Sequence, residues 1–379
     1  MKKSLLFAAM AAVAFASCTN DDVVEVNRGE GVFFRASLDK AQTRGVPTTL
    51  QTLGMFKVTG AYKNKPGAYF YDMVCTSDDN GASWKSDPKL PWVDDELAFF
   101  AYAGVEGEAA TDLFRNSNPY TVPTKVSEQN DILYAYNTGT KAANENTGVP
   151  LNFKHVLSQI DVKAKCSNKN MKIEILGVRI VNAATSAKFT APETETTSSY
   201  VLAQSQWSDW SGKDGGHEKA YYIKGNSPVT LTADAQSIMF GDDKFMLLPQ
   251  QLTKWESNAE KKGAYLSVLC RISSVDNNGI ETLLYPQPTD TDKKDGKYAF
   301  SAVPINTNWE PGKKYTYTLN FCGDDGGGGQ VDPDPDPTDP DVDPDPTDDD
   351  PGDPILGKPI YFTVTVDDWQ DQELDIDMQ

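Results

Sequence analysis

The chain has 379 residues and a formal net charge of −20 at pH 7, with 39% hydrophobic residues. Thirteen Asp and no Lys or Arg lie in residues 324–354, so most of the excess negative charge belongs to this segment and the rest of the chain is mildly acidic. This composition lacks the basic patch that nucleic-acid binding requires, and the length allows two folded domains.

The chain begins with the features of a secretory signal. Two lysines precede an apolar run over residues 5–15, which is too short for a stable membrane span. The following Ala16-Ser17-Cys18 resembles the lipobox of bacterial lipoproteins, and Thr-Asn-Asp-Asp at 19–22 resembles the signal that sends Bacteroidetes lipoproteins to the outer face of the outer membrane. We therefore predict a signal peptide over residues 1–17 and membrane anchorage through acyl chains on Cys18.

Short strand-like runs dominate the rest of the chain. Each is bounded by Gly, Pro, Asn, Asp or Ser, and long helical periodicity is almost absent, which favours an all-β fold of β-sandwiches. One helical turn is expected near residues 155–159. A polar stretch at 141–148 precedes a new cluster of strands and places a domain boundary close to Phe153. The predicted strands are 31–36, 54–62, 97–103, 160–165, 171–181, 244–248, 266–272 and 314–321.

The sequence offers no catalytic motif. It lacks a Gly-x-Ser-x-Gly elbow, a Walker loop and a His-Glu-x-x-His zinc motif. Its two histidines, His155 and His217, are far apart in sequence, and His155 is interpreted as a hydrogen-bonded core or boundary residue. We therefore expect a non-enzymatic protein without a cofactor.

Four cysteines remain when Cys18 is set aside. An even number in an exported protein allows disulfides, but the spacings are wide and no Cys-x-x-Cys pair occurs. Disulfides and isolated buried thiols both remain open for Cys75, Cys166, Cys270 and Cys322.

Residues 207–211, Trp-Ser-Asp-Trp-Ser, bring two indoles close together in a polar, Gly-rich stretch. Aromatic faces suit the apolar faces of sugar rings, so Trp207 and Trp210 are candidate glycan contacts. The alternative is that both indoles pack on the adjacent sandwich.

The acidic segment alternates Asp and Pro, which favours an extended chain whose like charges repel one another. An EF-hand needs Gly at its sharp turn and Glu at its end, and alternate prolines prevent the loop from curling, so no metal site is expected. The sequence therefore predicts a disordered Asp/Pro-rich spacer over residues 324–359.

A single strand-like run follows the spacer, at residues 360–366, before the end of the chain at 379. Its apolar residues alternate with Tyr and Thr, so they share one face of a strand. A strand alone must be completed by another sheet. At about 3.1 Å per residue the spacer reaches roughly 90 Å, so the strand can return to its own domain or complete a neighbouring molecule's sheet. The apolar residues are Ile360, Phe362, Val364 and Val366.

Four segments, taken in order, resemble the fimbrillin family of Bacteroidales, in its Mfa-like branch of type V pilus proteins. The first is Leu-Ala-Phe-Phe-Ala-Tyr at 97–102, and the second is the block at 151–162, which contains Phe153, His155 and an Ile-x-Val strand. The others are Leu-Leu-Pro-Gln at 247–250 and Val-Thr-Val-Asp-Asp-Trp at 364–369.

This resemblance implies two transthyretin-like β-sandwich domains, at 45–153 and 154–323, in a lipoprotein that assembles into surface fimbriae. The implied partners are other fimbrial subunits, the outer membrane and a host or bacterial surface ligand. The long spacer departs from the family pattern, because a long tether lowers the effective concentration of the last strand at any one groove. A monomeric surface glycan-binding lipoprotein is therefore the alternative, and tip, stalk and anchor roles stay open.

Proteolytic maturation is also implied by the resemblance. A protease would cut between Arg44 and Gly45, remove residues 18–44 with an early strand, and open a groove; Arg28 and Arg35 are competing positions. An open groove exposes apolar surface and unpaired backbone groups, which an incoming alternating strand satisfies. The donor residues would be Ile360, Phe362, Val364 and Val366.

Overall fold

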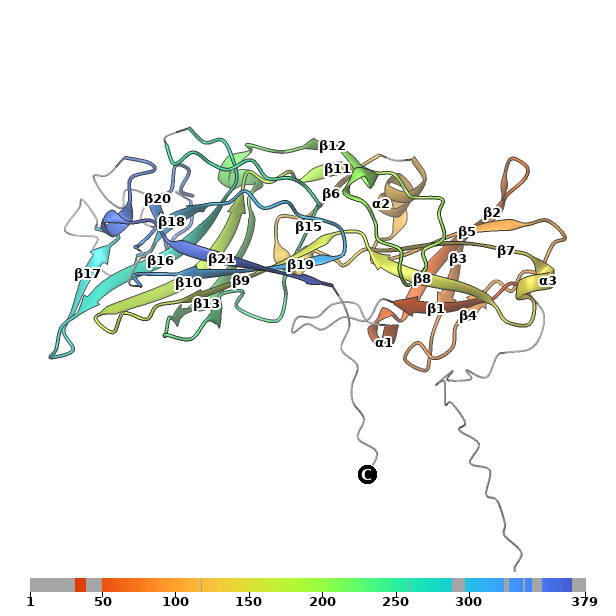
Figure 1. The fold of residues 1–379 in the computed structure, drawn as a ribbon, viewed down its shortest axis with the longest axis horizontal. Coiled ribbons are helices and arrows are strands. Elements are labelled where there is room, and N and C mark those ends of the chain that lie inside the picture. Colours follow the sequence, from red (N-terminus) through yellow and green to blue (C-terminus); the bar gives the residue numbers. More distant parts are fainter. Residues whose placement is uncertain are drawn as a thin grey trace, which may run out of the picture.

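A computed structural model describes residues 31–38, 50–116, 118–258, 260–287, 297–323, 327–336, 338–342 and 350–369. The molecule is elongated. The strands that precede residue 156, except β6 (Pro119–Thr121), are gathered at one end and most of the later strands at the other (Figure 1). None of the described helices is long and apolar enough to cross a membrane.

The first part of the chain forms one seven-stranded sheet. Its strands are mixed, because β1 runs parallel to β8 while the other neighbours are antiparallel. In spatial order they are β1 (Phe34–Leu38), β8 (Val149–His155), β7 (Leu133–Gly139), β5 (Leu97–Ala103), β2 (Met55–Tyr62), β3 (Ala68–Thr76) and β4 (Lys85–Asp87).

The later part forms two further sheets, of six and five strands, that share one core. The first runs β13 (Tyr221–Thr230), β10 (Met171–Val181), β16 (Tyr265–Val275), β18 (Ala299–Pro304) and β20 (Gln330–Val331), and β17 (Glu281–Tyr285) also pairs with β16. The second runs β14 (Gln236–Ser237), β9 (Ser158–Lys165), β19 (Lys313–Asn320) and β21 (Tyr361–Asp368), and β15 (Phe245–Leu247) also pairs with β9.

A small sheet and short helices complete the described structure. The small sheet contains β12 (Trp207–Ser211), β11 (Ser186–Phe189) and β6 (Pro119–Thr121). The α-helices are α1 (Leu50–Leu53), α2 (Gly107–Thr111) and α3 (Lys141–Asn144), and single turns of other helix types occupy Asp112–Asn116, Val126–Glu128, Gln204–Gln206, Gly216–Lys219 and Ile355–Gly357.

Strand β5 lies at the centre of the seven-stranded sheet and explains how the two ends are joined. Its sequence, Leu-Ala-Phe-Phe-Ala-Tyr-Ala, is apolar along its whole length, as expected for a strand that is buried on both faces. Phe99 packs on one face with Phe34 and Phe56, whereas Ala98 packs on the other face with Tyr134, in the core that extends into the later sheets. The two ends are therefore in contact through one continuous layer of side chains.

The predicted all-β sandwich class is confirmed, and each strand listed from the sequence has a counterpart in the structure. The helical turn expected at 155–159 is wrong. Strand β8 continues to His155 and β9 begins at Ser158, because Val156 and Leu157 are drawn into the core and leave only a two-residue link.

We expect Phe99→Ala to lower the free energy of unfolding by about 3–5 kcal/mol, because it leaves a cavity in a tightly packed core. Phe99 is 0% exposed, and its ring lies 5.3 Å from Phe34 and 6.1 Å from Trp92. Urea unfolding followed by circular dichroism measures the change. The matched control is Ile280→Ala, at a side chain that is 62% exposed, which should change stability by about 0.5 kcal/mol or less. Equal effects of the two substitutions would contradict the packing described.

Candidate functional site

Strand β1 forms one edge of the seven-stranded sheet, and its one neighbouring strand among the described residues is β8 (Figure 1). Phe34 lies opposite Val149 in the parallel register, and the backbone N–H of Val149 donates to the carbonyl of Phe33 at 3.0 Å. Val32 and Phe34 are only 1% and 3% exposed. β1 therefore covers the core through Phe34 and pairs, among the described residues, with β8 alone. Just before it, the backbone N–H of Val32 donates to the carbonyl of Leu90 at 2.7 Å.

Strand β21 occupies the edge of another sheet and pairs antiparallel with β19. The last strand thus completes its own molecule's sheet in this structure, which is one of the two outcomes that the sequence left open. Ile360 is buried, while Phe362 and Val364 are half-buried against the core and Val366 is 51% exposed. Most of the strand faces solvent, so little apolar burial holds it in place.

The residue after β21, Trp369, is almost completely buried and stacks on His155 with ring centroids 4.0 Å apart. The Nδ1 atom of His155 lies 2.9 Å from the carboxylate of Asp131, so the prediction of a buried, hydrogen-bonded histidine is confirmed. The backbone N–H of Trp369 donates to the carbonyl of Gly312 at 2.9 Å. These contacts fix the end of β21 beside the end of β8.

A cavity of about 630 Å³ lies where the ends of β1 and β21 meet. Two edge strands that are far apart in the sequence therefore terminate at one place on the molecule. The cavity is lined by Ser37, Leu38, Asn152, Lys154, His155, residues 198–202, Pro311, Gly312, Lys313, Asp368 and Trp369.

The described part of the acidic segment is folded against the protein. We call residues 332–341, of which Pro337 is not described, the Asp/Pro strap. Asp332 is 3% exposed, and its Oδ2 atom lies 3.0 Å from Nη2 of Arg179 on β10. Tyr265 and Ser267 on β16 also donate hydrogen bonds to the Asp332 carboxylate. The strap therefore supplies the counter-charge of a buried arginine.

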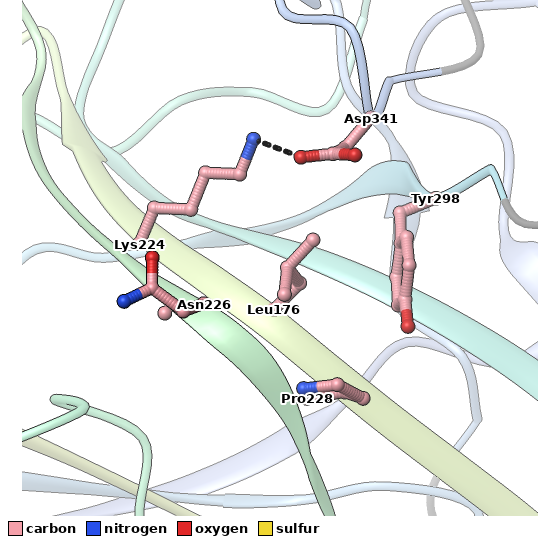
Figure 2. A pocket seen from close by; sticks show the side chains of 7 residues that line it. Leu176, Lys224, Asn226, Pro228, Tyr298 and Asp341 are labelled. Carbon is pink, nitrogen blue, oxygen red and sulfur yellow. Dashed lines mark ion pairs between the residues drawn. The ribbon is translucent and has the colours of Figure 1, made fainter.

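A second cluster holds the far end of the strap. Nζ of Lys224 lies 2.5 Å from Oδ1 of Asp339 and 2.6 Å from Oδ2 of Asp341. Figure 2 shows the second of these ion pairs, between Lys224 and Asp341. Burial opposes the charge on Lys224, but the hydrogen bonds to Asp339 and Asp341 outweigh it and raise its pKa. A cavity of about 510 Å³ beside this pair is lined by Leu176, Lys224, Gly225, Asn226, Pro228, Tyr298 and Asp341 (Figure 2).

These contacts correct the prediction of a disordered spacer for the described residues 327–336, 338–342 and 350–359. The prediction considered repulsion among the aspartates and left out the cations of the folded part. Arg179 pairs with Asp332, Lys261 with Asp334, and Lys224 with Asp339 and Asp341, so the strap is held along the sheet. Within the described residues, no group of three or more His, Cys, Asp or Glu side chains could hold a metal ion.

Trp207 is 1% exposed, and its Nε1 donates to the carbonyl of Val156 at 3.0 Å. Its ring also packs on Phe189, so it has no free face for a sugar, which corrects its prediction as a glycan contact. Trp210 is half-buried, and its Nε1 donates to the carbonyl of Pro249. The closed core around β11 and β12 draws in both indoles, as the packing alternative expected.

The four internal cysteines are free and buried: Cys75, Cys166, Cys270 and Cys322. Burial raises the pKa of the Cys322 thiol to about 12 and keeps it protonated at neutral pH.

Arg35 lies inside β1 and is exposed. The other residues predicted to take part in maturation or anchorage lie outside the described residues: Cys18, Arg28, Arg44 and Gly45.

The pairing of the strap with the sheet was missed from the sequence, although a signal was present. Arg179 interrupts the apolar run Ile-Leu-Gly-Val-Arg-Ile-Val at 175–181. An arginine at such a position is rarely buried without a carboxylate partner. The sequence did not indicate which of the many acidic residues that partner is.

A profile of a family described as fimbrillin-like matches residues 41–332 of the chain. Among solved structures, a fimbrial protein from Bacteroides vulgatus is 15% identical and has a TM-score of 0.50, with 90% of this chain and 100% of that chain covered. A proposed cell adhesion protein from Parabacteroides distasonis is 11% identical with a TM-score of 0.48, covering 88% of this chain and 99% of that one. No curated protein is matched by the sequence.

We expect the stability conferred by the strap to depend on pH through Asp334. Burial opposes ionisation of this carboxyl, but hydrogen bonds from Lys261 and His217 outweigh it, so its pKa lies below the usual value. A lowered folded-state pKa stabilises the fold above the unfolded-state pKa of about 3.9, and this stabilisation is lost as pH falls through the lower folded value.

Asp334→Asn should therefore lower the free energy of unfolding by about 1.5–3 kcal/mol at pH 7. The difference from the wild-type chain should shrink as the pH falls below the unfolded-state pKa of about 3.9. Denaturant titrations at a series of pH values measure it, with the exposed Asp242→Asn as the control. A difference that stays constant from pH 7 to pH ~2.5 would contradict the assignment.

Proposed function

Because the chain belongs to the fimbrillin-like family, we propose that it is a non-enzymatic, structural or adhesive subunit of cell-surface fimbriae that joins its neighbours by exchanging β-strands. The observation that carries the proposal is the position of β1. This strand covers part of the apolar core with Phe34, and in the part of the chain that the structure describes it pairs with β8 alone. Its departure would leave a groove lined by β8 and the aromatic core beneath it.

The maturation step that we propose removes β1. A cut after Arg44 would leave Gly45 as the new N-terminus and detach every residue of β1 from the covalent chain. Arg35 is a poorer substrate because its backbone is paired with β8. The matured subunit would consist of two transthyretin-like sandwich domains, at 45–153 and 154–323, followed by the strap and the last strand.

The vacated groove would expose unpaired backbone groups and an apolar space, and a donor strand can fill both. One is the row of backbone groups on β8, from Val149 to Phe153, which now pairs with β1. The other is the apolar space that Val32 and Phe34 fill. The alternating face of Ile360, Phe362, Val364 and Val366 has the pattern needed to fill such a groove in a neighbouring subunit.

Within residues 360–366 the last strand would lose little apolar burial in such an exchange, but the buried stack of Trp369 on His155 would have to open. β21 is an edge strand that is mostly exposed, and only Ile360 within 360–366 is fully buried in its own molecule. A strand that loses little apolar contact on leaving one sheet can gain more in a groove that is open to an aromatic core. The strands that end at the shared cavity, β1 and β21, are thus the two that we propose to move.

Export and anchorage complete the proposal. The signal at residues 1–17 would direct secretion, and acyl chains on Cys18 would hold the precursor at the outer membrane, exposed at the cell surface. Cleavage after Arg44 would then free the subunit from its lipid anchor, so one cut would both release the subunit and open its groove.

Locking β1 onto β8 should block assembly. The Ser37 hydroxyl donates to Oδ1 of Asn152, so these side chains already touch, and a disulfide in Ser37→Cys/Asn152→Cys would retain β1 even after proteolysis. We expect few or no polymers under oxidising conditions and recovery on reduction, scored by electron microscopy and by laddering on denaturing gels.

The matched control places a disulfide at Thr121→Cys/Ser186→Cys. These hydroxyls are exposed and 3.1 Å apart, on β6 and β11, away from both moving strands. This variant should polymerise like the wild-type chain. Normal polymers from the fully oxidised Ser37/Asn152 variant would refute exchange at β1.

Arg44→Ala should prevent maturation, since the proposed protease cuts after Arg or Lys. N-terminal analysis of protein sheared from cells should give Gly45 for the wild-type chain and for the control Arg28→Ala. The Arg44→Ala chain should instead keep Cys18 and stay with the membrane. Recovery of a Gly45 N-terminus from Arg44→Ala, or of an intact Cys18 terminus from wild-type fimbriae, would be inconsistent with the proposed cut.

A further inference from the structure

The Asp/Pro strap occupies a pre-built site for an acidic peptide. We call Arg179, His217, Lys261, Tyr265 and Ser267 the Arg179 site. The Arg179 side chain is 7% exposed, and its guanidinium lies 3.5 Å from the centroid of the Phe300 ring. A buried cation held over an aromatic face is fixed by the sheet itself and favours a carboxylate ligand.

The site contacts two successive acidic residues and the backbone carbonyl of the second. Asp332 accepts hydrogen bonds from Arg179, Tyr265 and Ser267. Asp334 accepts a hydrogen bond from the backbone N–H of His217 at 2.7 Å and a second one from Nζ of Lys261. Nη2 of Arg179 also donates to the Asp334 carbonyl, and the Asp334 N–H donates to Oδ1 of Asp332 at 2.8 Å. The site thus binds an Asp-Pro-Asp unit, with each of the two carboxylates on its own set of donors.

The loop before His217 is shaped around the second carboxylate. Gly216 has a φ of +62°, and a Cβ atom at this position would lie 2.2 Å from Oδ2 of Asp334. Glycine is therefore required both by the backbone conformation and by the close approach of the ligand. This is the geometry of a specific binding site, because a general electrostatic attraction would not need so close an approach.

The chain carries its ligand sequence twice. Val-Asp-Pro-Asp-Pro occurs at 331–335, where it fills the Arg179 site, and again at 342–346, where residues 343–346 lie outside the described residues. Proline sets the backbone of each copy close to an extended conformation, which reduces the entropy lost on binding. A second molecule of this chain therefore presents the same ligand.

We propose that the Arg179 site is a binding site for Asp-Pro-Asp segments, filled by the strap of its own chain and able to accept the strap of a second copy. The chain's own strap begins directly after β20 and so competes at an effective concentration on the order of millimolar or more. Binding between chains therefore requires that the internal strap be absent or altered. This contact goes beyond strand exchange and does not depend on it.

Two complementary variants of the full chain test the proposal. Asp332→Asn/Asp334→Asn/Asp343→Asn/Asp345→Asn, the quadruple variant, keeps the site but loses both copies of the ligand, whereas Arg179→Gln keeps the ligand but loses the site. Sedimentation velocity should show a heterodimer when the two are mixed and none for either variant alone. Circular dichroism and thermal melting of each variant verify the fold. A folded pair that stays monomeric when mixed would overturn binding between chains.

A labelled peptide with the sequence of residues 331–337 tests the site alone, by fluorescence anisotropy. It should bind the quadruple variant at least about tenfold more tightly than the wild-type chain, whose own strap competes. A peptide with Asn in place of each Asp should not bind. Equal binding of the two peptides, or equal binding to the two chains, would overturn the proposal.

A surface substitution keeps the test independent of core stability. Lys261 is 58% exposed at its side chain, so Lys261→Ala in the quadruple variant should preserve the fold and weaken peptide binding about threefold or more. The adjacent exposed Lys262→Ala is the matched control, since the described contacts of Asp334 involve Lys261 and not Lys262. Equal affinities of the two variants would contradict the assigned contact.

Discussion

A sheet that is buried on one face cannot leave its edge open, and this constraint organises the structure. Unpaired backbone groups and apolar side chains at an edge favour any strand that can cover them. At the edge of the seven-stranded sheet the covering strand is β1, whose Phe34 reaches the aromatic core. In the later half the edge beside β19 is covered by β21. Each of these strands is held along one side, and the two end at the same cavity.

The strap solves a second problem, which is electrostatic. Burying the charge of Arg179 without a partner would cost free energy, and Asp332 supplies the opposite charge. Tyr265 and Ser267 in turn donate hydrogen bonds to the Asp332 carboxylate. The alternating sequence then brings Asp334 to Lys261 and, further along, Asp339 to Lys224. A segment that repels itself in isolation is thus held against the sheet by the sheet's cations, at its described residues 332–336 and 338–341.

The sequence predicted those elements whose pattern is local. The run at 97–103 is apolar on both faces and bounded by breakers, and the strand begins and ends at the predicted residues; the same is true of 171–181. Pairings between distant segments, such as β1 beside β8 or β9 beside β19, depend on the global packing and have no local signature. The strap was misjudged for the same reason, because its order comes from Arg179 and Lys224, which lie more than a hundred residues earlier.

The central claim is that the edge now covered by β1 becomes the joint between subunits. It is tested most directly by cross-linking fimbriae assembled from a mixture of ¹⁵N-labelled and unlabelled subunits. The account predicts cross-links between β8 and residues 360–366 that join one labelled to one unlabelled chain. Fimbriae in which such cross-links occur only within chains of the same label would contradict it.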